Sequence, residues 1–201
     1  MERALGYLKR GFLVGVVALA ISIIAYYAMY TLVASAKEKW YAVVFPEWAE
    51  EELVELGAHL LLVLVIYFAA VAVGLYGMSL LWRGYSEVFG KRSAPAVGSL
   101  IVASSYFVGF LDPVVAVVLW AAGVVAAFVI GIYRLWKLFG DVRLELAALL
   151  NAVGVAFGLA LGLVTVVADV EVIVSLIYAY VAQTLLAIAA SLLTYLALRS
   201  Q

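Results

Sequence analysis

The sequence predicts an all-α integral membrane protein: a single polytopic bundle of six transmembrane helices in the cell membrane, with both termini in the cytoplasm. Three observations support this fold class, namely the composition, the length of the apolar runs and the distribution of Lys and Arg. Hydrophobic residues make up 69% of the chain and charged residues 12%, whereas soluble domains have about 45–50% apolar and about 25% charged residues. The apolar runs are continuous rather than alternating, which excludes a transmembrane β-barrel.

The apolar runs indicate the number and order of the helices. Bilayer hydrocarbon is roughly 30 Å thick and takes about 20 helical residues to cross. Six runs of about this length are predicted as helices, at 11–35, 56–81, 96–111, 113–133, 144–168 and 172–198. Short loops use up most of the remainder, so we expect residues 1–201 to form one membrane domain without a separate soluble domain.

The Lys and Arg residues orient this bundle. Ten of the twelve fall on one side of the six-span arrangement: Arg3, Lys9, Arg10, Arg83, Lys91, Arg92, Arg134, Lys137, Arg143 and Arg199. Short loops that are rich in these residues stay in the cytoplasm because the charged side chains resist translocation. The N-terminus and the C-terminus are therefore predicted to lie inside the cell.

The first helix, 11–35, has small residues on one face, which favours close packing against another helix. These residues are Gly11, Gly15, Ala18, Ser22 and Ala25. The segment that follows, 36–55, is the longest loop. Pro46 and the acidic residues after it suit the first turn of a helix, so we expect an interfacial helical turn that leads into the second helix.

The third and fourth helices, 96–111 and 113–133, are joined by an Asp112-Pro113 turn. Asp is a good helix cap, and Pro is tolerated at the first helical position. The third helix is short. A re-entrant loop in its place would reverse the fourth helix and break the alternation of the basic loops, so a full span is the better interpretation.

Glycines at four-residue spacing mark the fifth helix, 144–168, and the fourth helix has a similar stripe. The fifth helix carries a glycine zipper motif of Gly154, Gly158 and Gly162, and the fourth carries Gly123, Ala127 and Gly131. Glycine allows two helix backbones to approach closely. We therefore expect these residues to pack the fourth helix tightly against the fifth, or to form a seam for self-association.

Polar residues inside the apolar runs are the candidate functional residues. Tyr180, Gln183 and Thr194 share one face of the sixth helix, and Asn151 lies near the start of the fifth. A buried amide is costly in lipid unless it is paired, so Gln183 should face the bundle. These four residues either line a substrate path or hold neighbouring helices together. No ionisable residue lies in the middle of a span, which weighs against proton pumping.

The composition argues against several kinds of chemistry. The chain has no Cys, and its single histidine, His59, lacks the further ligands that a metal or haem site needs. We therefore expect no metal and no cofactor. The predicted cytoplasmic loops are too short for a nucleic-acid-binding stripe. Arg83, Arg134 and Lys137 on the cytoplasmic rim are expected to contact anionic lipid headgroups.

Two loop sequences resemble each other: Leu81-Trp82-Arg83 precedes Phe89-Gly90, and Ile132-Tyr133-Arg134 precedes Phe139-Gly140. They indicate either a parallel repeat or the general preference of membrane boundaries for aromatic residues and Arg. With Asn151-x-x-Gly154, the run that contains them resembles archaeal multi-spanning membrane protein families of uncharacterised function. The resemblance covers under half of the chain and implies no functional residue. The size and the six spans are also similar to those of substrate-binding subunits of vitamin uptake transporters, without a matching motif.

These observations favour a membrane protein without enzymatic activity. We expect an accessory or structural subunit of a membrane complex, with membrane lipids and other membrane subunits, or further copies of the chain, as partners. The alternative is a component of a small-solute transporter or channel. The surroundings of Gln183 separate the two: a subunit buries this amide against protein groups, whereas a transporter places it beside a cavity.

Overall fold

The computed structural model of the chain describes residues 1–39, 44, 49–109, 111–167, 172 and 175–201. Every regular element in these ranges is helical, which confirms the all-α fold class. The elements are α1 (Glu2–Glu38), α3 (Glu50–Phe89), α4 (Ala94–Val108), α5 (Pro113–Val124), the π-helix η2 (Val125–Ile130), α6 (Gly131–Phe139), α7 (Val142–Val167) and α9 (Ile177–Arg199). The interfacial turn predicted around Pro46 lies outside the described residues.

Five helical spans among the described residues are long and apolar enough to cross a membrane, as expected of a membrane bundle. One of them, Pro113–Phe139, is a continuous helix made of α5, η2 and α6. The remaining predicted span, the third one at 96–111, corresponds to α4, which has 15 residues. At 1.5 Å per residue α4 is about 22 Å long, so it is shorter than the roughly 30 Å of bilayer hydrocarbon.

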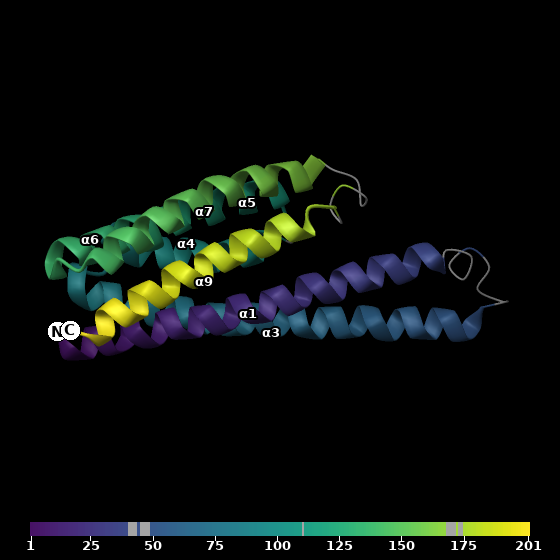
Figure 1. Cartoon of the computed structure of the whole chain (residues 1–201), viewed down its shortest axis with the longest axis horizontal. Coiled ribbons are helices and arrows are strands. Elements are labelled where there is room, and N and C mark those ends of the chain that lie inside the picture. Colours follow the sequence, from purple (N-terminus) through teal and green to yellow (C-terminus); the bar gives the residue numbers. More distant parts are fainter. Residues whose placement is uncertain (40–43, 45–48, 110, 168–171, 173–174) are drawn as a thin grey trace.

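The helices surround a common centre. Extensive contacts join α1 to α3, α3 to α4, α4 to α5, α5 to α7, α7 to α9, and α9 back to α1, so the neighbours form a closed ring. In Figure 1, α1 and α3 lie side by side along one edge of the bundle, and α9 lies between α1 and α7. This ring arrangement is what creates a shared interior.

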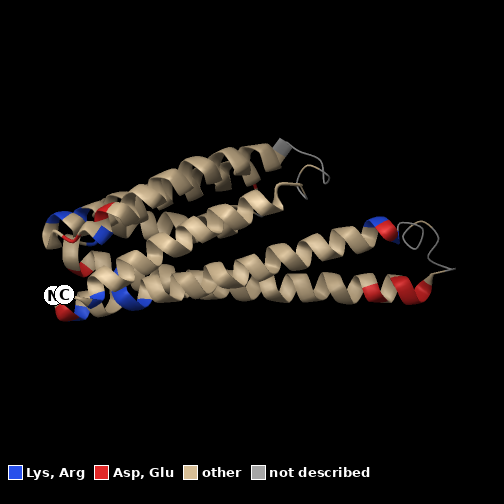
Figure 2. Ribbon diagram, in the orientation of Figure 1, with Lys and Arg blue, Asp and Glu red and all other residues tan. Residues whose placement is uncertain are grey.

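The charged residues gather at the two ends of the bundle and leave its middle uncharged (Figure 2). Both chain termini lie at one end (Figure 1), together with the basic residues that flank α1, α3, α6, α7 and α9. We call this the basic end. The opposite end, where α3 begins with Glu50, Glu51 and Glu52, we call the acidic end. The structure thus has the charge segregation along the bundle that the sequence indicates.

Most helix ends differ from the predicted ones because charged residues do not stop a helix in water. Helix α1 begins at Glu2, before the predicted start at residue 11, and α3 ends at Phe89, after the predicted end at residue 81. Two glycines after Phe residues end helices instead: Gly90 has φ 92° and Gly140 has φ 68°, a conformation that glycine adopts without steric cost. The two similar loop sequences therefore share a helix-ending Phe-Gly pair.

The turn between α4 and α5 agrees with its prediction at the helix start. The backbone N–H of Val115 donates a hydrogen bond of 3.0 Å to Oδ1 of Asp112, and Pro113 occupies the first turn of α5. The predicted cap is thereby confirmed. Helix α4 ends at Val108, which is three residues earlier than expected.

Small residues bring α1 and α3 into close contact. A β-carbon on Gly84 would lie 2.6 Å from Cγ of Leu8, and one on Gly11 would lie 2.8 Å from Cδ2 of Leu81. Distances this short leave no room for any side chain at either glycine. Of the small-residue face predicted for the first helix, Gly11 therefore packs against α3, whereas a β-carbon on Gly15 would have nothing within 4 Å.

The glycine stripe of the fourth span packs differently from the prediction. A β-carbon on Gly123 would lie 2.7 Å from the backbone N of Val102 in α4, and one on Gly98 of α4 would lie 2.7 Å from the backbone N of Ala127. Gly131 lies against Tyr85 of α3. The stripe thus faces α4 and α3 rather than the glycines of α7. Glycine spacing shows that a close partner exists but does not say which helix supplies it.

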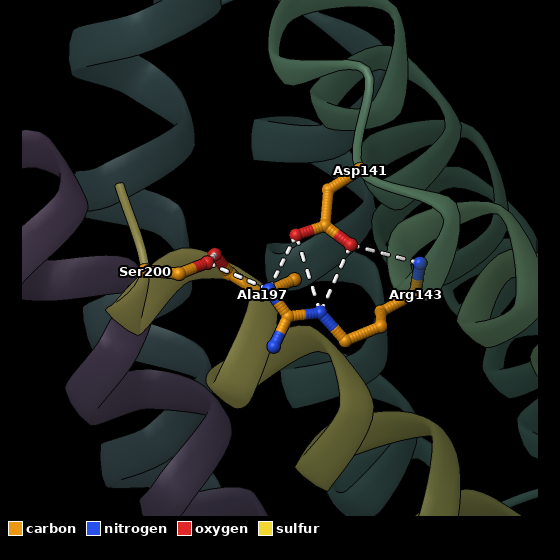
Figure 3. A network of polar contacts seen from close by, with 4 residues as sticks. All are labelled: Asp141, Arg143, Ala197 and Ser200. Atoms are coloured by element: carbon orange, nitrogen blue, oxygen red, sulfur yellow. Dashed lines mark hydrogen bonds and ion pairs between the residues drawn. The ribbon is translucent and has the colours of Figure 1, made fainter.

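A network of hydrogen bonds at the basic end joins Asp141 and Arg143 to Ser200 (Figure 3). The guanidinium of Arg143 donates to both carboxylate oxygens of Asp141, at distances of 2.6–3.2 Å, and to Oγ of Ser200 at 2.7 Å. Asp141 also accepts from the backbone N–H of Arg143 at 2.9 Å, in the first turn of α7. These hydrogen bonds from Arg143 hold the pKa of the Asp141 carboxyl below its usual value. The network ties the start of α7 to the residue that follows α9.

Candidate ligand-binding cavity

The ring of helices lines a partly open cavity of about 560 Å³, which is within the range of roughly 300–1,000 Å³ that is common for ligand pockets. Every helix of the ring contributes to its lining. The contributors are Gly15, Ala18, Leu19, Ser22, Ala25 and Tyr26 of α1; Tyr67, Ala70, Val71, Gly74 and Met78 of α3; Val102, Ser105 and Tyr106 of α4, with Gly109 after it; Pro113, Ala116, Val117, Trp120 and Val124 of α5; Phe128 of η2; Asn151, Gly158 and Gly162 of α7; and Tyr180, Gln183, Thr184, Ala187 and Ser191 of α9.

The lining combines an apolar surface with a few neutral polar groups. None of the described lining residues is charged. Aromatic rings come from several helices, among them Tyr106 of α4, Trp120 of α5 and Tyr180 of α9. Transfer of an unpaired ion from water into such surroundings is strongly unfavourable. The cavity is therefore suited to an uncharged molecule.

Three of the four predicted polar residues meet in this cavity. Gln183 and Tyr180 of α9 and Asn151 of α7 line it. Thr194 does not: it is completely buried nearer the basic end and donates a hydrogen bond of 2.9 Å to the backbone oxygen of Ala190. The polar face of the sixth predicted helix is thus divided between a cavity wall and a packed core.

The side chain of Gln183 is the most distinctive polar group of the cavity. Within the described part of the chain, no hydrogen bond reaches its amide, so both its donor and its acceptor are free. The amide lies over Gly158, where a β-carbon would overlap Nε2 of Gln183 and would lie 2.6 Å from Cη2 of Trp120. Gly158 therefore makes the space in which Gln183 and Trp120 meet.

The other two glycines of the α7 motif have different surroundings. A β-carbon on Gly162 would lie 2.9 Å from a methyl carbon of Val117, so α5 packs into α7 through side chains at Gly158 and Gly162. A β-carbon on Gly154 would have nothing within 4 Å. The expected contact between the fourth and fifth spans therefore exists, but Gly154 takes no part in it and no glycine faces a glycine across it.

A smaller pocket of about 30 Å³ adjoins the cavity beside Gln183. Five residues line both spaces: Trp120, Val124, Asn151, Gln183 and Ala187. Its volume is comparable with that of one water molecule. The pocket thus places space for one small polar group next to the amides of Asn151 and Gln183.

The cavity is closed toward the basic end. Phe128, which lines it, packs against Phe12 of α1. Beyond these rings lies a core of side chains with no exposed surface: Leu8, Leu81, Tyr85, Ile132, Leu135, Leu144 and Leu198. Phe128 belongs to the π-helix η2, a helix form that is uncommon and occurs frequently at functional sites.

Aromatic and hydroxyl contacts join three helices on the acidic side of the cavity. The rings of Tyr26 in α1 and Tyr180 in α9 have centroids 5.6 Å apart. The hydroxyl of Tyr180 is hydrogen-bonded to Thr165 of α7 and lies 3.3 Å from the backbone oxygen of Leu161. Tyr180 therefore connects α9 to both of its neighbours in the ring.

The remaining predicted site residues lie on the surface of the basic end. Arg134 is 5.9 Å from the ring centroid of Phe89, and Lys137 is 4.3 Å from that of Trp136. Both side chains and Arg83 are exposed, a position that suits contact with lipid headgroups. Among the described residues, no group of three or more His, Asp or Glu side chains is placed to hold a metal ion.

Several cavity residues were not among those proposed from the sequence. Trp120 and Tyr106 lie within apolar runs, where aromatic side chains usually face lipid or a core. Tyr26 has the position of a residue in the interfacial aromatic belt, yet it contacts Tyr180 across the ring. Only the arrangement of the helices shows that these rings share one space.

The fold and the cavity together define an all-helical protein whose long apolar helices are compatible with a membrane bundle and whose described residues line an uncharged cavity. The chain matches no protein-family model, no curated protein and no solved structure.

Proposed function

We propose that this protein spans the cell membrane six times, with both termini in the cytoplasm, and that it binds a small uncharged molecule and carries it across the membrane. The observation that supports this function is the free amide of Gln183 at the wall of a 560 Å³ cavity. An amide inside an apolar bundle costs several kcal/mol unless something pairs with it. A ligand or water in the cavity supplies that pairing, whereas no protein group does so among the residues that the structure describes.

The closed basic end supports transport rather than a permanent pore. A binding space that is sealed on one side by the Phe12–Phe128 contact resembles one state of a carrier, in which access alternates between the two sides of the membrane. In the proposed orientation, the sealed side faces the cytoplasm. Movement of a solute then requires Phe12 and Phe128 to separate.

Co-purification tests the proposal. The wild-type chain and Gln183→Leu are purified under the same conditions, and their small molecules are extracted and identified by mass spectrometry. We expect an uncharged molecule to be retained by the wild type and lost from Gln183→Leu, with similar helix content in both. Proteoliposomes loaded with that molecule should then release it faster with the wild-type chain than with the variant.

The same experiment addresses the other function expected from the sequence. An accessory or structural subunit would co-purify with a protein partner, and Gln183→Leu would change the assembly and leave the release of any solute unaltered. That outcome would replace the transport proposal with the subunit function. A glutamine that faces an open cavity favours transport, because a subunit has no use for an unpaired amide in its interior.

A further inference from the structure

We infer that the molecule bound in the cavity is a neutral amphiphile, with an apolar body and one small hydroxyl or carbonyl head that binds Gln183. This inference rests on the proposed function, since it names the class of ligand for the same cavity. It follows from three properties of the cavity: the polar groups that remain free, the position of the small side pocket, and the size of the main space.

Four polar side chains in the lining have hydrogen-bond partners in their own helices. The hydroxyls of Ser22, Ser105 and Thr184 donate to backbone oxygens three or four residues earlier, at 3.0, 2.7 and 2.8 Å. The amide of Asn151 donates to the backbone oxygen of Ala147 at 2.9 Å. The three hydroxyls offer a ligand acceptor positions because their donors are engaged, whereas the Asn151 amide keeps a second N–H donor.

Gln183 and Asn151 are the two amide side chains that line the side pocket, so hydrogen-bond donors and acceptors lie together there. The Gln183 amide offers a donor and an acceptor side by side, and the oxygen of Asn151 is a second acceptor on the same wall. A hydroxyl can use both a donor and an acceptor, and a carbonyl can use the donor. The side pocket of about 30 Å³ has space for a group of this size and for little more.

The lining and the volume of the main cavity determine what the part of the ligand beyond its polar head can be. The lining is dominated by aliphatic and aromatic side chains, such as Met78, Val117 and Phe128, so a molecule with many hydroxyl groups would lose hydrogen bonds to water without replacing them. At roughly 30 Å³ for each water-sized group, 560 Å³ has room for on the order of 18 such groups. A chain or ring system of about a dozen carbons with one polar end fits these limits.

Fluorescence quenching of Trp120 tests this ligand class. The full chain is prepared with the other four tryptophans, Trp40, Trp48, Trp82 and Trp136, replaced by Phe, and is placed in lipid nanodiscs. The probe is 2-bromo-1-undecanol, whose bromine lies next to the hydroxyl that binds Gln183 and therefore close to Trp120, since bromine quenches an indole that it contacts. The controls are 1-bromoundecane, which lacks the hydroxyl head, and 2-bromoundecanoate, which is charged at neutral pH. A second chain that retains only Trp136 reports quenching from the surrounding bilayer.

We expect saturable quenching of Trp120, and not of Trp136, by the bromoalcohol, and no saturable quenching by the bromocarboxylate. Gln183→Leu should weaken the binding of the bromoalcohol about tenfold, as expected for the loss of about one hydrogen bond, and leave the binding of 1-bromoundecane unchanged. Equal, non-saturable quenching of both tryptophans would overturn the inference, as would equal binding of the carboxylate or an unchanged affinity in Gln183→Leu.

The two proposals fail in different ways. If the molecule that co-purifies with the wild type is neutral but highly polar, and the bromoalcohol does not bind, the ligand class is wrong and carriage of a neutral solute stands. If the bromoalcohol binds through Gln183 but proteoliposomes release it no faster than empty liposomes do, the ligand class stands and transport is wrong.

Discussion

The ring of Phe12 in α1 meets the ring of Phe128 in η2 nearly at a right angle, with centroids 6.0 Å apart and an interplanar angle of 81°. Edge-to-face contact is a favourable geometry for two aromatic rings. One of these rings is almost completely buried, since Phe12 has 1% of its surface exposed, and the other lines the cavity. The pair therefore forms the boundary between the binding space and the packed core of the basic end.

Replacing Phe128 with Ala should weaken this boundary. The substitution removes a half-buried ring and should lower the stability by about 1–3 kcal/mol, below the cost for a fully buried Phe. It should also speed the release of the co-purified molecule from proteoliposomes. Thermal unfolding and release rates measure the two effects. Phe107→Ala is the matched control, because Phe107 is 62% exposed and does not line the cavity. Equal release by both variants would show that Phe128 does not close the cavity.

Two glycines of the α7 motif should respond very differently to the same substitution. Gly158→Ala places a methyl group where the Gln183 amide and the Trp120 ring lie, so it should destabilise the protein by about 1–3 kcal/mol through overpacking. The β-carbon of Gly154→Ala has nothing within 4 Å and Ala gains helix propensity, so this variant should be neutral or stabilising. Melting temperatures in lipid nanodiscs compare the two variants. Similar losses in both would show that α5, α7 and α9 are not packed as described here.

The Asp141–Arg143 pair should make stability depend on pH in the acidic range. The lowered pKa of Asp141 in the folded protein means that the ionised carboxylate favours folding above the unfolded pKa of about 3.9. This contribution is lost as the pH falls through the folded-state pKa. Asp141→Asn should therefore lower the melting temperature slightly at pH 7, and by progressively less as the pH falls below about 3.9.

Glu145→Gln is the control for this effect, because Glu145 is exposed and lies one turn further along α7. It should change the melting temperature little at either pH. A loss in Asp141→Asn that is as large at about pH 3 as at pH 7 would show that the side chain acts through its shape or its neutral hydrogen bonds, and that its charge is unimportant.

Cysteine labelling should reveal the orientation, since the chain has no cysteine of its own. Lys91→Cys and Lys137→Cys lie at the exposed basic end, and Glu51→Cys lies at the acidic end. A membrane-impermeant maleimide applied to intact cells should label Glu51→Cys alone, and the other two should react only after the membrane is opened. External labelling of Lys91→Cys would contradict the proposed topology.

The sequence by itself determined the fold class, because continuous apolar runs and segregated charges leave few alternatives to a helical membrane bundle. It also indicated the Asp112 cap, which depends on neighbouring residues only. It did not indicate the true ends of α1 and α3, since helical turns outside an apolar run remain stable in water. Nor did it reveal the π-helix η2, whose residues are ordinary helix-compatible side chains.

The sequence predicted only part of the candidate site. An unpaired amide in lipid is costly wherever its helix lies, so Gln183 could be selected from one helix alone. The tertiary structure decided the rest: it placed Gly158 beneath Gln183, brought Trp120 to the same wall, and turned Gly123 toward α4 rather than α7. Each of these outcomes depends on the rotation and order of the helices around the ring, and these are set by contacts between residues far apart in the chain.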